Sequence, residues 1–437
     1  MADPAEPKER QLGLVALTAL VVGNMVGSGI FLLPSALAPL GGTSILAWVA
    51  SAGGSLCFGL VIARLARRLP LVGGPYAYTR EAFGEFAAFL VGWGYWISCW
   101  VAQAAIAVAM VGYLGELVPA AKGHPMGVAL TAIVVLAAVN VRGVREAGLV
   151  QVVTTVLKVL PLLAIALLGF ARFEPAHFEP FNPTATSLPV AVLSGLALTL
   201  WAFQGFESAS IAAHEARDAR RNVPRATLLG IGLATVLYVA STLAVMGLLP
   251  REELAASTAP FADAAGVLWG SGARKLVALG AFVSCFGALN GWILVAGRLP
   301  LAIARDGLFP AFFGRVTARG TPGLALLLSS ALACLLIVLR FSGAGGLVAV
   351  FQAMIVLATL SALVPFVFCA MAELLLAGRE RRAGGAASHG TTGIALLAFA
   401  FGLATIAFAG AENVLWGFLL LLGGIPFYVL ARVRGGT

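Results

Sequence analysis

The chain alternates long apolar runs with short polar segments, and most of the apolar runs have the length of a membrane-spanning helix. A helix of about 20 apolar residues crosses the hydrocarbon core of a bilayer. About twelve runs fit this description: residues 12–38, 43–65, 83–118, 126–141, 149–171, 188–213, 226–249, 273–304, 323–340, 345–377, 391–409 and 412–432. The pattern therefore predicts an all-α polytopic membrane protein with about 12 transmembrane helices.

Glycines interrupt the first and the sixth of these runs near their middles. The interruptions are Gly27-Ser28-Gly29 and Gln204-Gly205-Phe206-Glu207. Inside hydrocarbon, a helix can unwind only where protein or a ligand satisfies the freed backbone groups. Matching interruptions in two halves of a membrane protein indicate an inverted repeat that holds its substrate between half-helices. The sequence therefore predicts a transporter with broken helices 1 and 6.

The order of the runs predicts a single transmembrane transporter domain over residues 1–437. Five runs, about 12–171, form the first repeat, and five more, about 188–377, form the second. Because each repeat has an odd number of spans, the second is inverted relative to the first in this 5+5 arrangement. The runs within about 391–432 are two additional helices.

Composition and charge agree with a membrane protein and exclude other classes. Hydrophobic residues make up 60% of the chain and charged residues 11%, which is more apolar surface than a soluble domain buries. The five cysteines lie in apolar runs without a CxxC pair, so neither a disulfide framework nor a thiolate metal site is expected. No motif for a cofactor or for membrane-embedded hydrolysis is present, and an enzyme is not expected.

The net charge of +9 is an orientation signal rather than a nucleic-acid footprint. With the N-terminus in the cytoplasm, the inner segments hold 20 of the 28 Lys and Arg residues. Cytoplasmic loops of membrane proteins are enriched in these residues. We therefore expect cytoplasmic N- and C-termini, membrane lipid as a partner and no nucleic-acid partner.

The first interruption offers backbone amides, small residues and a hydroxyl at the start of a new half-helix. Asn24, Met25, Ser28 and Gly29 lie there. The N-terminus of a helix binds carboxylates. Glycines that allow close helix packing are the alternative interpretation. The matching interruption in the sixth run favours a binding site over helix packing as the interpretation of the first.

Two ionisable residues fall within apolar runs, where such residues are usually functional. Glu207, at the second interruption, can attract a cationic substrate group or exchange protons, or it can be a structural partner of a hydroxyl or amide. Lys158, in the run 149–171, can replace a sodium ion with a fixed cation, couple transport to protons by deprotonation, or tether two helices. Trp201 and Trp292 fall at mid-span, where they can cap a substrate by cation–π contact.

Seven motifs carry a resemblance to a known family. They are Gly23–Pro34, Gly73–Tyr78, Tyr95–Trp100, Trp201–Ser210, Arg221–Pro224, Gly291-Trp292 and Asp306–Pro310. On these motifs the chain resembles the amino acid, polyamine and organocation transporters, and the likeness covers nearly all twelve spans. Within them it is most similar to the bacterial arginine:agmatine exchangers.

The resemblance implies a role for each residue that matches the family's site. Substrate binding falls on Asn24, Met25, Ser28, Gly29, Ser98, Cys99, Gln103, Trp201, Gln204, Trp292 and Ala358. Gating or proton coupling falls on Tyr95, Trp201, Glu207, Trp292, Phe366 and Lys158. It also implies a bacterial cytoplasmic (inner) membrane location and a homodimer as one option.

The chain departs from those exchangers at several of these positions. Gln103 stands where they have an asparagine, Ala202 and Ala358 replace serines, and Phe366 lacks a tyrosine hydroxyl. Lys158 is similar to a lysine of sodium-independent transporters elsewhere in the superfamily. The departures imply a pocket less polar than an arginine site.

The sequence therefore predicts a sodium-independent amino-acid antiporter that works by alternating access. We expect it to exchange a cationic, arginine-like amino acid for its amine or for another amino acid. A proton-coupled permease for neutral amino acids and a non-transporting amino-acid sensor are the two alternatives.

Overall fold

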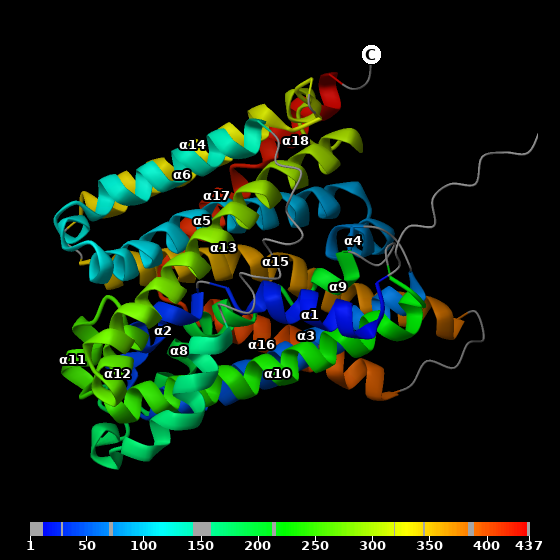
Figure 1. The fold of residues 1–437 in the computed structure, drawn as a ribbon. Helices are drawn as coiled ribbons and strands as arrows, with labels where there is room; N and C mark the ends of the chain where they lie inside the picture. Colours follow the sequence, from blue (N-terminus) through cyan, green and yellow to red (C-terminus); the bar gives the residue numbers. More distant parts are fainter. Residues whose placement is uncertain are drawn as a thin grey trace, which may run out of the picture.

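The computed structural model describes residues 12–27, 29–69, 73–142, 159–211, 216–318, 320–343, 346–382 and 389–434. Within these ranges the chain is almost entirely helical, and its one β-bridge joins Leu12 to Ala216. The long helices run side by side across Figure 1. Helix α4 (Pro75–Phe83) lies toward one end of the bundle, and α11 (Arg251–Ala256) and α12 (Pro260–Trp269) lie at the other. We refer to these as the α4 end and the α12 end.

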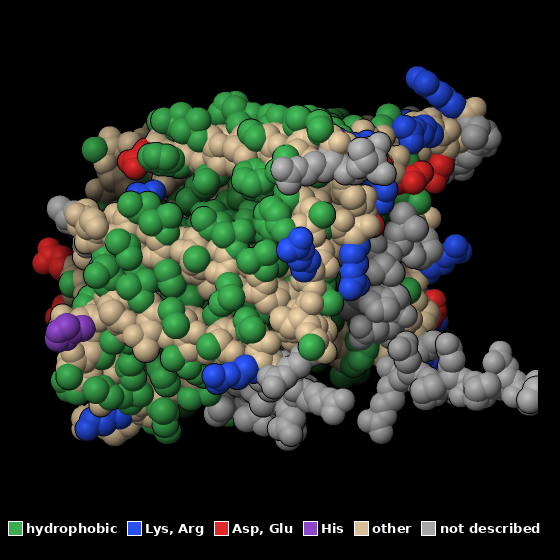
Figure 2. All heavy atoms as spheres, turned by 90° about the horizontal axis from the view of Figure 1, so that it is seen from above, with side chains coloured by type: hydrophobic (Ala, Val, Ile, Leu, Met, Phe, Trp, Pro, Cys, Tyr) green, Lys and Arg blue, Asp and Glu red, His purple; other side chains and the backbone are tan. Residues whose placement is uncertain are grey.

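The structure confirms a polytopic membrane protein. Eight helices in the described ranges are long and apolar enough to span a membrane: α3 (Thr43–Arg68), α5 (Glu85–Leu117), α6 (Pro125–Arg142), α10 (Ala219–Leu248), α13 (Ser271–Arg305), α14 (Gly323–Phe341), α15 (Leu347–Arg382) and Ala411–Val433. A bent pair, α1 (Leu14–Met25) and α2 (Gly29–Leu37), gives a further span. Three shorter apolar helices, Val159–Arg172, α8 (Leu188–Phe203) and Thr392–Ala407 within α16 (His389–Ala407), bring the total to the predicted number. Hydrophobic side chains predominate on the face in Figure 2, and most of its Lys and Arg lie toward the α4 end.

Helices that hold equivalent positions in the two predicted repeats pack against each other. Helix α3 contacts α10, α5 contacts α13, and α6 contacts α14. The broken helices also meet, because α1 contacts α9 (Ser208–Ile211) and α2 contacts α8. Pairing of like with like is expected of two repeats related by a pseudo-two-fold axis.

The predicted runs differ from the helices at several places. The short helices α4, α11 and α12 lie between predicted runs, where the sequence suggested only loops. Helix α10 begins at Ala219, earlier than expected, and continues through Pro224. The last run breaks between α17 (Ala411–Leu422) and α18 (Ile425–Arg434).

A tertiary contact lies at the break in the last run. Trp93 of α5 donates its indole N–H to the carbonyl of Leu420, at 2.9 Å. Its ring also occupies the space beside Gly424, where an added Cβ would come within 2.7 Å of it. The indole therefore takes a carbonyl that a continuous helix would use for its own hydrogen bond.

The α4 end contains a buried carboxylate that is paired with an arginine, and removal of the arginine gives a stability prediction. Glu373 of α15 is fully buried, and Arg68 of α3 lies 3.2 Å from its Oε2. Removing one partner of a buried ion pair costs about 3–5 kcal/mol. We expect Arg68→Ala to lower the free energy of unfolding by that amount, as measured by denaturation in detergent micelles.

Arg340→Ala is the matched control, because it removes an arginine from an exposed pair. Arg340 lies 3.7 Å from Glu412, whose side chain is 73% exposed. Such pairs contribute about 0–1 kcal/mol. Equal losses in the two variants would show that Glu373 does not depend on Arg68.

Candidate functional site

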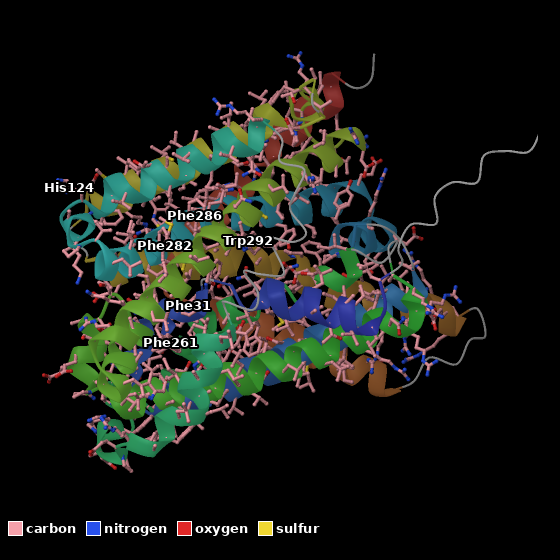
Figure 3. All side chains as sticks on the ribbon, in the orientation of Figure 1. Phe31, His124, Phe261, Phe282, Phe286 and Trp292 are labelled. Atoms are coloured by element: carbon pink, nitrogen blue, oxygen red, sulfur yellow. The ribbon has the colours of Figure 1, made fainter. Side chains whose placement is uncertain are left out.

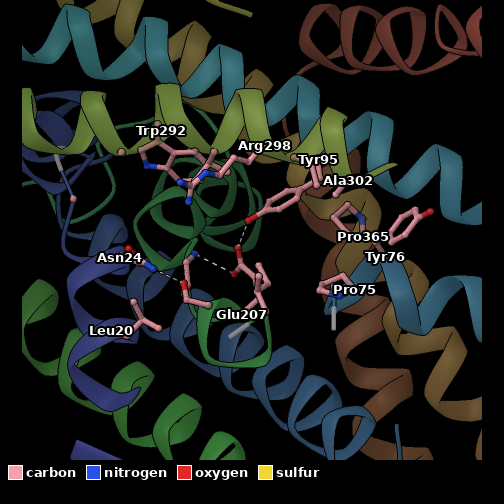
Figure 4. Close-up of a pocket in the computed structure, with 18 of the residues that line it drawn as sticks. Leu20, Asn24, Pro75, Tyr76, Tyr95, Glu207, Trp292, Arg298, Ala302 and Pro365 are labelled. Atoms are coloured by element: carbon pink, nitrogen blue, oxygen red, sulfur yellow. Dashed lines mark hydrogen bonds between the residues drawn. The ribbon is translucent and has the colours of Figure 1, made fainter. Parts of the chain in front are cut away.

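A cavity of about 510 Å³ extends from the two helix breaks toward the α4 end (Figure 4). Its wall includes Asn24 from the first break, Gly205 from the second, and Trp292 from α13. Near the α4 end it is lined by Tyr76 of α4 and Ala302 of α13. A cavity that begins where two half-helices unwind is the expected position of a transported substrate.

The two breaks touch through their backbones at Gly205. Its φ of +110° is one that L side chains rarely adopt. A Cβ on this residue would lie 2.9 Å from the carbonyl carbon of Asn24. Glycine is therefore required both by conformation and by close approach. The structure confirms the unwinding at both predicted interruptions.

A short chain of hydrogen bonds joins the breaks. The Asn24 amide donates to Ser208 Oγ at 2.7 Å, and Ser208 Oγ donates to the carbonyl of Gly205 at 2.5 Å. Polar groups freed by unwinding are satisfied in this way instead of by helical bonds. Asn24 remains exposed to the cavity.

Glu207 places a carboxylate at the junction of the breaks. Tyr95 of α5 donates its hydroxyl to Glu207 Oε1 at 2.6 Å, and the amide of Gly205 donates to Oε2 at 3.1 Å. The residue is only 1% exposed. Among the described residues that line the cavity, it is the one acid. The site can therefore attract a cationic group.

The N-terminus of α2 is covered in this conformation. Trp201 is 6% exposed, and its Nε1 lies only 2.2 Å from where a Cβ on Gly29 would be. Beyond it, toward the α12 end, the ring of Phe31 packs edge-on against Phe261 and Tyr113 (Figure 3). Tyr113 also donates its hydroxyl to the Phe31 carbonyl at 2.6 Å. Packed side chains thus separate the site from the α12 end, whereas the cavity continues toward the α4 end.

Tyr76 and its partners hold α4 at the mouth of the cavity. The Tyr76 hydroxyl donates to Asp306 Oδ2 at 2.8 Å, and Arg80 lies 3.3 Å from the same oxygen. Burial, together with the hydrogen bond to Asp306, raises the pKa of Tyr76. The hydroxyl therefore stays protonated near neutral pH and continues to donate.

The predicted site residues separate into three groups. Four line the cavity: Asn24, Tyr95, Glu207 and Trp292. Nine are buried in the described chain but do not line it in this conformation: Met25, Gly29, Ser98, Cys99, Gln103, Trp201, Gln204, Ala358 and Phe366. Ser28 and Lys158 lie outside the described residues. The roles predicted for all of them remain predictions.

Several of the buried residues have partners within the bundle. Ser98 donates to the carbonyl of its helix neighbour Tyr95 at 2.8 Å. The side chain of Gln103 extends from α5 toward α13, and its Nε2 lies 3.5 Å from the Trp292 carbonyl. Gln204 donates to Thr359 of α15 at 3.2 Å.

Sequence reasoning gave no substrate-binding role to Ser208, Tyr76 or Arg298, all of which line the cavity. The signal for Arg298 was its spacing. Residues 288, 291, 295, 298 and 302 fall at helical intervals on the cavity face of α13. The position of an arginine in this series is therefore consistent with a place on the cavity wall as well as with an anchor at the membrane surface.

Comparison with known proteins identifies relatives over nearly the whole chain. The family model described as amino acid permease matches residues 12–431. The chain is 36% identical to the cadaverine/lysine antiporter of Escherichia coli (strain K12) over 342 residues, which is 77% of each chain. It is 30% identical to the putrescine transporter PotE of the same strain over 438 residues, 98% of each.

Proposed function

Since the chain belongs to the amino acid permease family, we propose that it is a sodium-independent antiporter for a basic amino acid and its decarboxylated amine or another amino acid. One observation carries this proposal: the Glu207 carboxylate lies at the meeting point of two unwound helices, on the wall of a cavity. An ammonium or guanidinium group would be stabilised there by the negative charge.

The names of the relatives support the same substrate class. One is a cadaverine/lysine antiporter and another a putrescine transporter, so both names include amines that carry two positive charges near neutral pH. An amino acid and its decarboxylated amine share the cationic end that Glu207 would bind. They differ in the carboxylate, which would bind to the N-terminus of α2 in another conformation, where Trp201 no longer covers it.

We infer that the structure represents the inward-facing state of an alternating-access cycle. The α4 end carries the cationic clusters that the positive-inside rule assigns to the cytoplasm, including Arg68 and Arg80. Both termini would then be cytoplasmic, in the inner membrane of a bacterium. Exchange follows if the empty carrier reorients slowly and bound substrate stabilises the occluded state. Sodium independence rests on the fixed charge predicted for Lys158.

Uptake into sodium-free proteoliposomes tests this proposal. We expect radiolabelled lysine or arginine to enter vesicles preloaded with lysine, cadaverine, arginine or agmatine, and not empty vesicles. Absence of uptake under every cationic load would contradict a basic amino-acid exchanger. Sodium-dependent uptake would contradict the role given to Lys158.

A proton-coupled permease for neutral amino acids is the second candidate. Leu20, Val91, Val295 and Leu299 give the cavity an apolar wall that suits an aliphatic side chain. Uptake of leucine into empty vesicles, driven by an inward proton gradient, would favour this candidate. Ligand binding without flux under any load would indicate a non-transporting sensor.

A further inference from the structure

Arg298 gives the cavity a positive charge that a receptor for cations does not explain. It lies on α13, six residues beyond Trp292, and its side chain is exposed on the cavity wall (Figure 4). Among the described lining residues it is the one basic side chain. No hydrogen bond or ion pair of Arg298 occurs within the described ranges. By contrast, Arg68 and Arg80 at the α4 end have carboxylate partners.

An unpaired guanidinium in an apolar cavity is a receptor for an anion. Its planar fork of N–H donors matches a carboxylate in a bidentate arrangement. The other carboxylate receptor of the site, the N-terminus of α2, is covered by Trp201 in this conformation. A carboxylate that occupies the cavity while it is open to the α4 end therefore meets Arg298 and not α2.

We propose that Arg298 is a second carboxylate site, which holds the carboxylate of the amino acid on the α4 side of the helix breaks and selects the amino acid over its decarboxylated amine. The proposal rests on the proposed function and names the group that distinguishes the two exchanged substrates. The amino acid leaves the α2 terminus and transfers its carboxylate to Arg298 as the cavity opens.

The charges of the cavity support selection in this direction. Glu207 and Arg298 are its two charged side chains among the described residues, and their formal charges cancel. An amino acid can therefore place a cationic group near Glu207 and its carboxylate near Arg298. A diamine brings only positive charge, so one ammonium is attracted by Glu207 while Arg298 repels the molecule in a poorly hydrated space. Snorkelling of Arg298 to water at the α4 end, the ordinary expectation for this position, predicts no such selection.

Competition binding to the purified full-length protein tests the proposal. The ligands are pairs that differ by one carboxylate: lysine and cadaverine, ornithine and putrescine, arginine and agmatine, and leucine and isoamylamine. For each pair, the ratio of the amine Kd to the amino-acid Kd is measured in wild type, Arg298→Gln and Arg298→Lys. Arg298→Gln should lower the ratio at least about tenfold, which is the effect of losing a hydrogen bond to a charged group. Arg298→Lys, which keeps the positive charge, should preserve most of the ratio.

The outcomes separate this proposal from the proposed function. Arg298→Met, which is also neutral, replaces the glutamine variant if the latter does not elute as a folded protein. An unchanged ratio in the folded neutral variant would overturn the carboxylate site, even where wild-type exchange of basic amino acids is intact. A ratio for leucine and isoamylamine that depends on Arg298, in a protein that exchanges no basic amino acid, would support the site and reject the exchanger.

Discussion

Glu207→Gln should reduce exchange of basic amino acids at least about thirtyfold, because loss of one partner of a buried charge pair costs about 2–5 kcal/mol. The carboxylate is buried, and it accepts hydrogen bonds from Tyr95 and from the amide of Gly205. Glutamine has nearly the same shape but no charge for the substrate cation. Its amide can keep both contacts, with the oxygen toward the Gly205 N–H and the NH2 toward the Tyr95 hydroxyl, so the variant isolates the loss of charge.

Tyr95→Phe is the control that separates charge from position. It removes the hydroxyl that lies 2.6 Å from Glu207 Oε1 and leaves the carboxylate in place. We expect a loss of about tenfold, the magnitude of a hydrogen bond to a charged group. Initial rates in lysine-loaded proteoliposomes check both variants. Wild-type exchange by Glu207→Gln would show that the substrate cation binds elsewhere.

The helices were predictable to the extent that their causes are local. Hydropathy marks a span by itself, and glycine within an apolar run marks a break, as at Gly27 and Gly205. The break before α18 falls at Gly423-Gly424, a local signal that the predicted run 412–432 did not use, whereas the contact of this break with Trp93, more than 300 residues away in the chain, was not predictable. The helices between residues 250 and 272 were missed because each is shorter than the stretch of sequence over which helical periodicity can be recognised.

The cavity was predictable only in part, because in the proposed transport cycle one sequence serves several conformations. Glu207 and Asn24 line the cavity since they belong to the breaks themselves. Gln103 and Ser98 lie on α5, but Gln103 reaches the Trp292 carbonyl of α13 and Ser98 donates to the Tyr95 carbonyl within its own helix. A resemblance assigns residues to a site over the whole cycle, whereas a single structure shows one step of it. Sequence reasoning assigned no binding role to Arg298, because hydropathy does not reveal which face of α13 borders the cavity.

The contact between the two breaks makes Gly205→Ala the other substitution with a large expected effect. Alanine at a φ of +110° is strained by about 1–3 kcal/mol, and its Cβ would overlap the backbone of Asn24, which cannot rotate away as a side chain would. If the strain raises the barrier of the transport cycle by about 2 kcal/mol, the exchange rate falls about thirtyfold. We therefore expect a loss of this size or greater, together with a lower midpoint of thermal unfolding in detergent.

Gly291→Ala tests whether this effect belongs to the contact or to any added methyl group in the cavity. Gly291 also lines the cavity, but it lies within α13, and no described atom comes within 4 Å of an added Cβ. Alanine favours a helix over glycine by about 1 kcal/mol, so stability should be unchanged or higher and exchange should stay near the wild-type rate. If the two alanines slow exchange equally, cavity volume limits transport. If only Gly205→Ala slows exchange, transport requires the close approach of the two unwound segments. The two half-helices share one binding site only while their backbones touch.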